Sequence, residues 1–137
     1  MMGALLFLLL PFLFMQPNGG SCCEYQRNLE KTSAMIFFSA EDMRTHVEYF
    51  EPLYPPGLDR KLNISGVIEM EVRYDPQGKA ECIRILSGNP IGVSAMMESI
   101  DRWRFKPAKI NGIPTWCCGR IVVEYRFHKG SAASRLK

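Results

Sequence analysis

Few side chains in this sequence could do chemistry, and their spacing matches no catalytic arrangement. The two histidines, His46 and His128, lie far apart, and neither is accompanied by a serine or cysteine motif that would supply a nucleophile. Glu69 and Glu71 are two residues apart on a predicted strand, so both carboxylates would face water, whereas acid–base catalysis needs one of them in an apolar niche. A glycine-rich phosphate loop is also absent from the sequence. We therefore expect no catalytic residue, no cofactor and no enzyme activity.

The five cysteines are the remaining reactive groups. Cys22 and Cys23 are adjacent, as are Cys117 and Cys118, and Cys82 stands alone. None has the C-x-x-C spacing or the nearby histidine of a metal site, so we expect no bound metal. In an exported chain the sulfurs would be oxidised, but the odd number leaves one of them as a free thiol, lipidated, or paired between chains.

The position of the cysteines on predicted strands narrows their pairing. Neighbours on a strand point to opposite faces, so at most one of Cys117 and Cys118 can meet Cys82 across a sheet. Burial as small hydrophobic residues is the simpler interpretation of Cys82 and of one member of the 117–118 pair. A thiol-dependent activity at Cys117 and Cys118 is the alternative hypothesis.

The composition is that of one globular domain with an appendage. The chain of 137 residues is 47% hydrophobic and 23% charged, and its formal net charge is +3. Nucleic-acid binding needs a clustered basic stripe, and the 17 basic and 14 acidic residues are too balanced for one. We therefore expect no nucleic acid as a partner.

The N-terminal segment reads as a targeting signal. Residues 1–21 carry no charged side chain, and the run from Ala4 to Met15 is apolar apart from Pro11. As a helix this run would cover about 18 Å, which is short of a hydrocarbon core of about 30 Å. We therefore favour a signal peptide cut near Cys22 over a short membrane anchor. The sequence Gly19-Gly20-Ser21-Cys22 also faintly resembles a bacterial lipoprotein cleavage site, so lipidation stays open.

The elements that would position these groups follow from hydrophobic periodicity. Ser39 and Asp42 favour the start of a short helix over about 40–49, within a polar linker. Alternating apolar residues predict a strand over 66–74 and a second over 80–87, and Asp75-Pro76-Gln77-Gly78 between them is typical of a tight turn.

A helix and a last strand complete the predicted domain. Apolar residues at three- and four-residue spacings predict a helix over 91–103, which Pro107 would stop. Asn111-Gly112 predicts a turn, and alternation predicts a third strand over 120–127. The order strand, strand, helix, strand predicts an α+β fold with two layers, in which a three-stranded antiparallel sheet carries a helix packed on one face. Residues 129–137 would form a polar tail.

Seven short motifs, in this order, resemble the TonB C-terminal domain family. They are Tyr54-Pro55-Pro56, Ile64-Ser65-Gly66-Val67, Asp75-Pro76-Gln77-Gly78, Ser87-Gly88-Asn89-Pro90, Trp103-Arg104-Phe105-Lys106-Pro107-Ala108, Asn111-Gly112-Ile113-Pro114 and the strand that ends at Phe127. Each motif alone is weak, and seven in order are specific. The resemblance divides the chain into a signal peptide or anchor (1–21), a polar, partly helical linker (22–51), a TonB C-terminal-like domain (52–128) and the tail (129–137).

The resemblance implies a periplasmic domain of an energy transducer that joins an inner-membrane motor complex to outer-membrane TonB-dependent transporters. Such a domain adds an extended transporter peptide as a strand to the exposed edge of its sheet, which the last strand forms. An unpaired edge offers a row of N–H and C=O groups to any extended chain. The matching partner-binding residues here are Arg120, Val122, Glu124 and Arg126.

Other motif residues are expected to hold the domain together. These structural anchors are Tyr54, Trp103, Phe105, Pro107 and Phe127. The chain also departs from full-length transducers, because residues 17–52 contain no stiff proline-rich spacer. It therefore resembles a short form, for which peptide binding is the first expectation. The alternative is a structural envelope protein that forms a homodimer through the same edge, with no transporter partner.

Overall fold

The computed structural model of the protein describes residues 22–23, 35–55 and 62–137. The predicted signal peptide over 1–21 lies outside these residues. The elements in chain order are β1 (Met35–Phe38), α2 (Ala40–Thr45), β2 (Val47–Tyr49), β3 (Asn63–Tyr74), β4 (Ala80–Ser87), α3 (Pro90–Ile100), β5 (Arg104–Phe105), β6 (Ala108–Ile110), β7 (Ile113–His128) and β8 (Ser131–Leu136). Neither helix in the described residues is long and apolar enough to cross a membrane.

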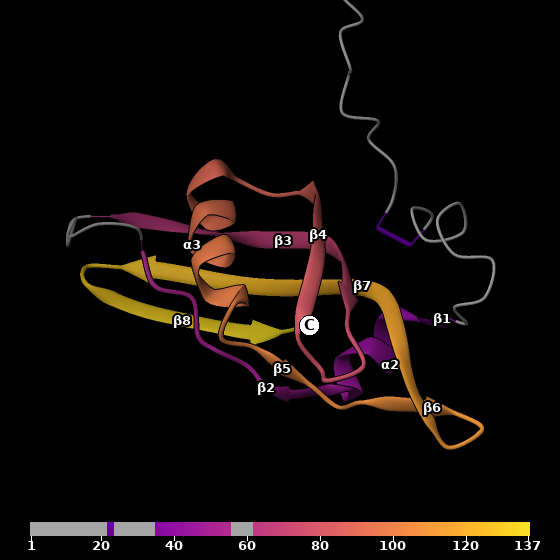
Figure 1. Ribbon diagram of the computed structural model, residues 1–137. Helices are drawn as coiled ribbons and strands as arrows, with labels where there is room; N and C mark the ends of the chain where they lie inside the picture. The colour runs from indigo at the N-terminus through magenta and orange to yellow at the C-terminus, as the bar shows by residue number, and fades with distance from the viewer. Residues whose placement is uncertain (1–21, 24–34, 56–61) are drawn as a thin grey trace, which may run out of the picture.

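The long strands β3 and β7 form the centre of the fold (Figure 1). They pair antiparallel over the whole of β3, from Asn63 opposite His128 to Tyr74 opposite Cys117, and β4 pairs with the other edge of β3. The prediction of an α+β fold is confirmed. The prediction of a three-stranded sheet is wrong, because β1, β6 and β8 also pair with β7 and make a six-stranded mixed sheet. β1 and β8 come from segments that flank the predicted domain, and β6 lies between the predicted helix and the predicted last strand.

The predicted β3–β4 hairpin is confirmed together with its turn. The Gly78 N–H donates to the Asp75 carbonyl at 2.9 Å, and Gly78 has a φ of +87°. The Asp75 carboxylate also accepts from the backbone N–H of Gln77 and of Lys79. A residue with a Cβ would be strained at this φ, which explains why glycine closes the turn.

Helix α3 ends earlier than predicted. It begins where the Asn89 side chain accepts from the N–H of Ile91 at 2.9 Å, and it ends at Ile100. The Trp103 N–H still bonds to the Ile100 carbonyl, but the next residues leave as β5, because the Phe105 N–H donates to the Gly78 carbonyl at 2.9 Å. Pro107 lies beyond β5, after the helix has already ended at Ile100, and therefore does not stop the helix.

Helix α2 is also shorter than the predicted helix over 40–49. Ser39 caps it as expected, because its hydroxyl accepts from the Asp42 N–H at 3.1 Å. After Thr45 the chain extends as β2 and pairs with β5, with Val47 opposite Phe105. Pairing with a strand that is distant in sequence therefore outweighs the helical pattern.

Both helices cover the same face of the sheet. Met43 of α2 lies against Gly119 of β7, and a Cβ at Gly119 would approach the Met43 side chain to 3.0 Å. In α3, Gly92 lies against the ring of Tyr125, where a Cβ would come within 2.5 Å. The glycine in α3 therefore lets the helix approach β7 closely. The main core cluster includes Met43, Ile68, Met70, Val72, Tyr74, Met96, Ile100, Trp103, Phe105, Ile121, Val123, Tyr125 and Phe127.

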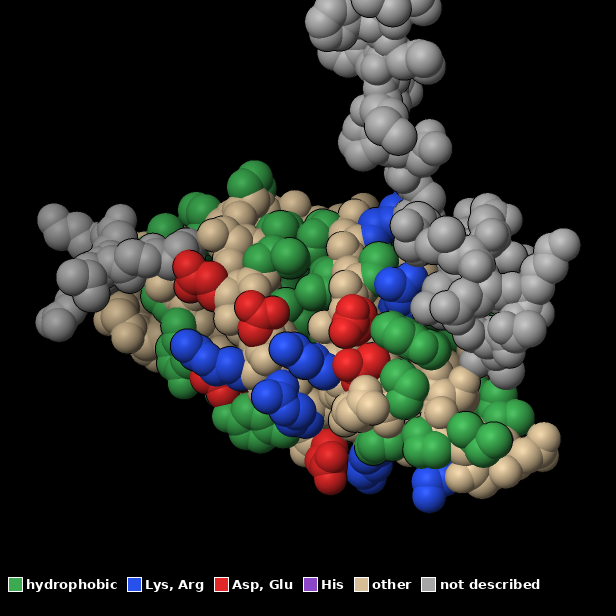
Figure 2. Space-filling view, viewed as in Figure 1, with side chains coloured by type: hydrophobic (Ala, Val, Ile, Leu, Met, Phe, Trp, Pro, Cys, Tyr) green, Lys and Arg blue, Asp and Glu red, His purple; other side chains and the backbone are tan. Residues whose placement is uncertain are grey.

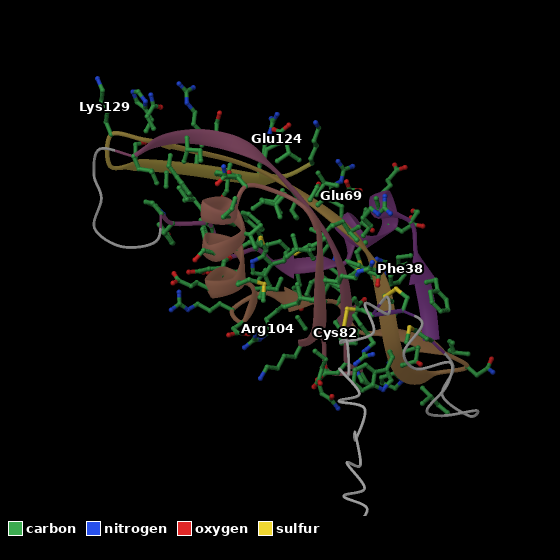
Figure 3. The ribbon with its side chains drawn as sticks, turned by 90° about the horizontal axis from the view of Figure 1, so that it is seen from above. Phe38, Glu69, Cys82, Arg104, Glu124 and Lys129 are labelled. Atoms are coloured by element: carbon green, nitrogen blue, oxygen red, sulfur yellow. A yellow bond between two sulfur atoms is a disulfide. The ribbon has the colours of Figure 1, made fainter. Side chains whose placement is uncertain are left out.

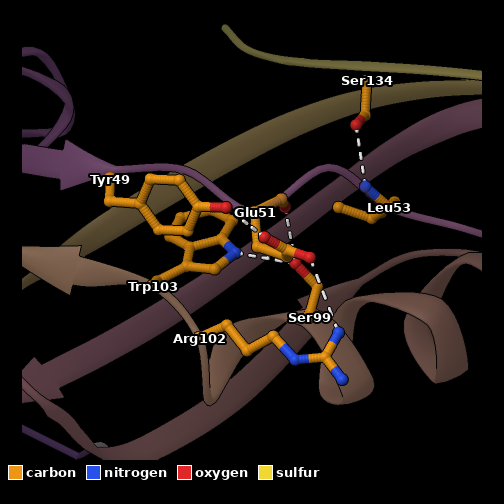
Figure 4. Close-up of polar contacts among 7 residues, drawn as sticks. All are labelled: Tyr49, Glu51, Leu53, Ser99, Arg102, Trp103 and Ser134. Carbon is orange, nitrogen blue, oxygen red and sulfur yellow. Dashed lines mark hydrogen bonds and ion pairs between the residues drawn. The ribbon is translucent and has the colours of Figure 1, made fainter.

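Trp103 connects α3, the segment that follows β2 and the sheet (Figure 4). Its side chain is fully buried, and its ring packs edge-on against Phe50 at 4.8 Å between centroids. The indole N–H donates to the Ser99 hydroxyl at 2.8 Å, and that hydroxyl donates to the Glu51 carbonyl at 2.6 Å. The polar atom of the buried indole is thus satisfied, and a residue after β2 is tied to the helix.

We expect Trp103→Ala to lower the free energy of unfolding by about 3–5 kcal/mol, because it removes a large buried ring and leaves a cavity. The matched surface change is Arg102→Ala, which removes only a solvent-exposed ion pair to Glu51 and should cost less than about 1 kcal/mol. Urea unfolding followed by circular dichroism measures both. An effect of Trp103→Ala as small as that of Arg102→Ala would contradict the anchoring role.

Candidate strand-binding edge

The outer edge of β7, on the side away from β3, is the edge that the sequence predicts for partner binding. In the structure it is not exposed along most of its length (Figure 1). Strand β1 pairs parallel with residues 116–119, and β8 pairs antiparallel with residues 123–128. The expectation of an open edge is therefore wrong, because both covering strands belong to the same chain. Arg120 and Ile121 lie between the two paired stretches.

Main-chain groups of the predicted contact residues point toward this edge. The N–H of Lys137 donates to the Val122 carbonyl at 2.9 Å. Hydrogen-bonded positions alternate along an antiparallel pair, so Glu124 and Arg126 also direct their N–H and C=O groups toward β8. Three of the four predicted contact residues thus lie where an added strand would pair, and Arg120 lies just beyond β8.

The side chains of these residues lie on the face of the sheet opposite the helices, as Glu69 and Glu124 show in Figure 3. Arg120 Nη1 of β7 is 2.8 Å from Glu69 Oε1 of the neighbouring strand β3. Glu124 accepts from Arg135 Nε at 2.6 Å and lies 3.4 Å from Lys137 Nζ. The hydrogen bond from Arg135 holds the pKa of the Glu124 carboxyl below its usual range.

Charge is mixed rather than clustered. On the face seen in Figure 2, Lys and Arg side chains are interspersed with Asp and Glu side chains. Among the described residues of the candidate edge, each of the ion pairs above joins one acidic and one basic side chain of neighbouring strands. Charged side chains at this edge are therefore paired with opposite charges nearby, and Glu124 has two such partners, Arg135 and Lys137.

Strand β8 is formed by the residues that the sequence predicts as a polar tail. The chain reverses through Lys129 and Gly130, whose φ values are 47° and 81°. This two-residue turn with glycine in second place is the signal that could have predicted a hairpin. The signal is weak because β8 itself has the sequence Ser-Ala-Ala-Ser-Arg-Leu, which shows no strong strand propensity.

Contacts of β8 with the rest of the domain are few. The Leu53 N–H donates to the Ser134 hydroxyl at 2.9 Å, as Figure 4 shows. Leu136 is the β8 side chain that packs against the core. A hollow of about 210 Å³ lies where β8 meets β7, and it is lined by Glu124, Tyr125, Arg126, Ala133, Ser134 and Arg135.

The predicted anchors separate into two groups. Trp103, Phe105 and Phe127 are buried in the core. Tyr54 is 57% exposed and Pro107 is exposed, so neither of them packs in the core. Proline-rich and aromatic motifs can mark a bend as well as a core contact, which explains why sequence alone did not separate the two groups.

Two disulfides tie the adjacent cysteines to the sheet. Cys22 is bonded to Cys82 in β4, and Cys23 is bonded to Cys118 in β7. The interpretation of Cys82 as a buried hydrophobic residue is therefore wrong. A lipid on the Cys22 sulfur is incompatible with the Cys22–Cys82 bond. The remaining cysteine, Cys117, is buried as a free thiol.

The alternative hypothesis of a thiol-dependent activity at Cys117 and Cys118 is not supported by this arrangement. Cys118 is oxidised, and burial raises the pKa of the Cys117 thiol, which disfavours the thiolate that a nucleophile needs. Burial also raises the pKa of the neighbouring Tyr74 hydroxyl. Possible ligand atoms of Cys23, Glu71 and Cys118 lie within 4.8 Å of one another, but the two sulfurs are bonded to each other and offer no thiolate to a metal.

Comparison with known proteins gives one match. Residues 51–127 match the family model described as Gram-negative bacterial TonB protein C-terminal, which covers more than half of the chain. No curated protein and no solved structure matches the chain. The matched range contains β3, β4, α3 and almost all of β7, and β1 and β8 lie outside it.

We expect one free thiol per chain. Because four of the five cysteines are paired, the unfolded, unreduced protein should take up one maleimide, and the folded protein should take up almost none at neutral pH, since Cys117 is buried. Intact-mass spectrometry counts the adducts. The variant Cys117→Ser is the control and should take up none in either state. Three or more adducts on the unreduced wild-type chain would contradict the two disulfides.

Proposed function

Because the chain belongs to the Gram-negative bacterial TonB protein C-terminal family, we propose that it is an exported, periplasmic binding domain for an extended segment of an outer-membrane transporter. The family is transport-associated, envelope-associated and non-catalytic. In this proposal the segment adds as a strand to the outer edge of β7 and so supports energy-dependent transport. Arg120, Val122, Glu124 and Arg126 would border it.

One observation carries this proposal. The N–H and C=O groups of Val122, Glu124 and Arg126 face away from β3, and the strand they meet is a short segment from the end of the chain. Main-chain groups at a sheet edge bind any extended chain with suitable alternation, and little sequence is demanded of the ligand. The edge is thus chemically suited to strand addition although it is covered in the free chain.

Apart from its outer edge, β7 is firmly held in the domain. β7 is held along its length by β3, and its inward side chains Ile121, Val123, Tyr125 and Phe127 are buried in the core. A strand that exchanges on the outer edge therefore need not disturb the packing beneath α3. A motor complex of the inner membrane would act on the chain through residues N-terminal to the domain, as the family resemblance implies.

Self-association through the same edge is the alternative. A homodimer would pair β7 of one chain with a strand of another, and it would need no transporter. The two hypotheses differ in concentration dependence, because dimer formation changes the edge amides when the protein is concentrated without added peptide. Sedimentation of the free chain at increasing concentration separates them.

We expect extended peptides derived from outer-membrane transporters to shift the amide resonances of residues 120–128 when they are titrated into the ¹⁵N-labelled chain. Val122→Pro should abolish these shifts, because it removes an N–H that faces the outer edge and not β3. Val122→Thr keeps the N–H and should bind like the wild type.

A peptide control separates main-chain pairing from side-chain contact. In an added strand the N–H groups of alternate residues point toward β7, so N-methylation of that set should weaken binding strongly, whereas N-methylation of the other alternate set should leave binding nearly unchanged. Shifts confined to the helices, or equal binding of the two N-methylated peptides, would sink the proposal.

A further inference from the structure

The two strands that cover the outer edge of β7 are held in different ways. β1 follows a segment whose adjacent cysteines are bonded to the sheet, and Cys118 itself lies opposite Phe37 of β1. Ile36 and Phe38 of β1 also pack against the core. The part of the edge over residues 116–119 is therefore covered by a strand that follows a covalently attached segment.

No side chain of β8 is buried, in contrast to those of its neighbours. The contacts described for it, besides its pairing with β7, are the partial burial of Leu136, the hydrogen bond to the Ser134 hydroxyl, and the ion pairs of Arg135 and Lys137 with Glu124. All of these involve residues 134–137, which are the last three residues of β8 and the residue after it. Surface ion pairs and a single hydrogen bond hold a strand weakly, so β8 is the part of the cover that can leave.

The side chains of β8 also fill their place incompletely. Ala133 and Ser134 are small, and they border the hollow of about 210 Å³ at the β7–β8 boundary. Ser134 lies opposite Tyr125 and Ala133 opposite Arg126, so a strand with larger side chains at these positions would fill more of the hollow. The covering strand is thus matched to the edge in backbone and charge but not in volume.

We propose that β8 is an internal placeholder for the partner strand, and that its pattern describes the partner. An incoming strand would run antiparallel to β7 over residues 122–128, with an aliphatic residue opposite Val123, a basic residue opposite Glu124, and a residue at least as large as serine opposite Tyr125. This inference rests on the proposed function and adds to it the direction and charge of the ligand.

Charge is the most specific part of this pattern. When β8 leaves, the Glu124 carboxylate loses both Arg135 and Lys137. A basic residue of the partner restores an opposite charge at this position, whereas an acidic residue meets a like charge across the strands, which is unfavourable. Glu124 therefore selects among extended chains that the backbone alone would accept equally.

The test uses the full chain and its own tail as a probe. An octapeptide with the sequence of residues 130–137 is added to ¹⁵N-labelled wild-type protein and to the variant Arg135→Glu with Lys137→Glu. In the variant the internal β8 is repelled by Glu124, so the edge opens more often and the peptide should bind roughly tenfold more tightly than it binds the wild type. The amide shifts should fall on residues 122–128.

Two controls make the result specific. A peptide with glutamate in place of both basic residues should not bind this variant. Adding Glu124→Lys to the variant restores opposite charges between β7 and β8, so affinity for the original octapeptide should fall back to the wild-type level or below it. The substituted side chains are at least partly exposed to solvent, and the amide spectrum reports directly whether each variant is folded.

The inference is overturned if the variant binds the octapeptide no more tightly than the wild type, if the acidic peptide binds equally well, or if the variant dimerises by exchanging its tail. Failure of the proposed function is a separate outcome. Binding of the octapeptide without any binding of transporter peptides would leave the placeholder intact and remove the transporter as partner. Equal binding of transporter peptides to the wild type and to the variant would keep the transporter as partner and remove the role of β8 as a placeholder.

Discussion

The main-chain donors and acceptors on the outer edge of β7 are the constraint on which the rest of the fold depends. The inner edge is paired with β3 along twelve residues, which leaves a row of main-chain donors and acceptors on the other side. Such a row must be paired or hydrated, and an exposed long edge also invites aggregation. The chain meets this constraint with its own flanking segments, because β1 pairs over residues 116–119 and β8 over 123–128. Binding of a partner at this edge is then an exchange of strands and not a simple addition.

The two strands that cover this edge, β1 and β8, are held in different ways. Cys22 and Cys23, which precede β1 in the chain, are bonded to β4 and β7, and β1 pairs with β7 over residues 116–119. β8 is joined to β7 by a two-residue turn and held by polar contacts at the surface. The core beneath is anchored by Trp103 and its hydrogen bond to Ser99, and Leu136 is the β8 side chain that packs against it. A domain built this way can lose one strand at its edge while the rest of it remains folded.

Much of this fold could be predicted from the sequence, and the errors have physical causes. The alternation over 66–74 and 80–87, with Asp75-Pro76-Gln77-Gly78 between, fixes a hairpin because the turn chemistry and both strand patterns agree. The predicted end of α3 is too late, since Trp103 fits the helical spacing but its backbone belongs to the turn that leads to β5. β1 pairs with a strand about eighty residues away, and local periodicity cannot report such a partner. β8 was missed because its stability comes from an existing edge and not from its own composition.

The candidate site, too, could be predicted only in part from the sequence. Val122, Glu124 and Arg126 could be assigned to the outward face because a strand period identifies every second residue, and burial alternates strictly from Gly119 to His128. That their main-chain groups are already paired could not be found, because pairing is a property of two segments. The family match over 51–127 stops short of β8, so resemblance gave no indication of the cover either.

Native-state hydrogen exchange of the free chain tests the central claim most directly, namely that β8 opens while β3 and β7 stay paired. The amides of Arg135 and Lys137 should exchange through an opening of lower free energy, with little dependence on denaturant, than the amides of Ile121 and Val123 that face β3. If all four amides share one opening free energy and one denaturant dependence, β8 leaves only when the domain unfolds, and the account is contradicted.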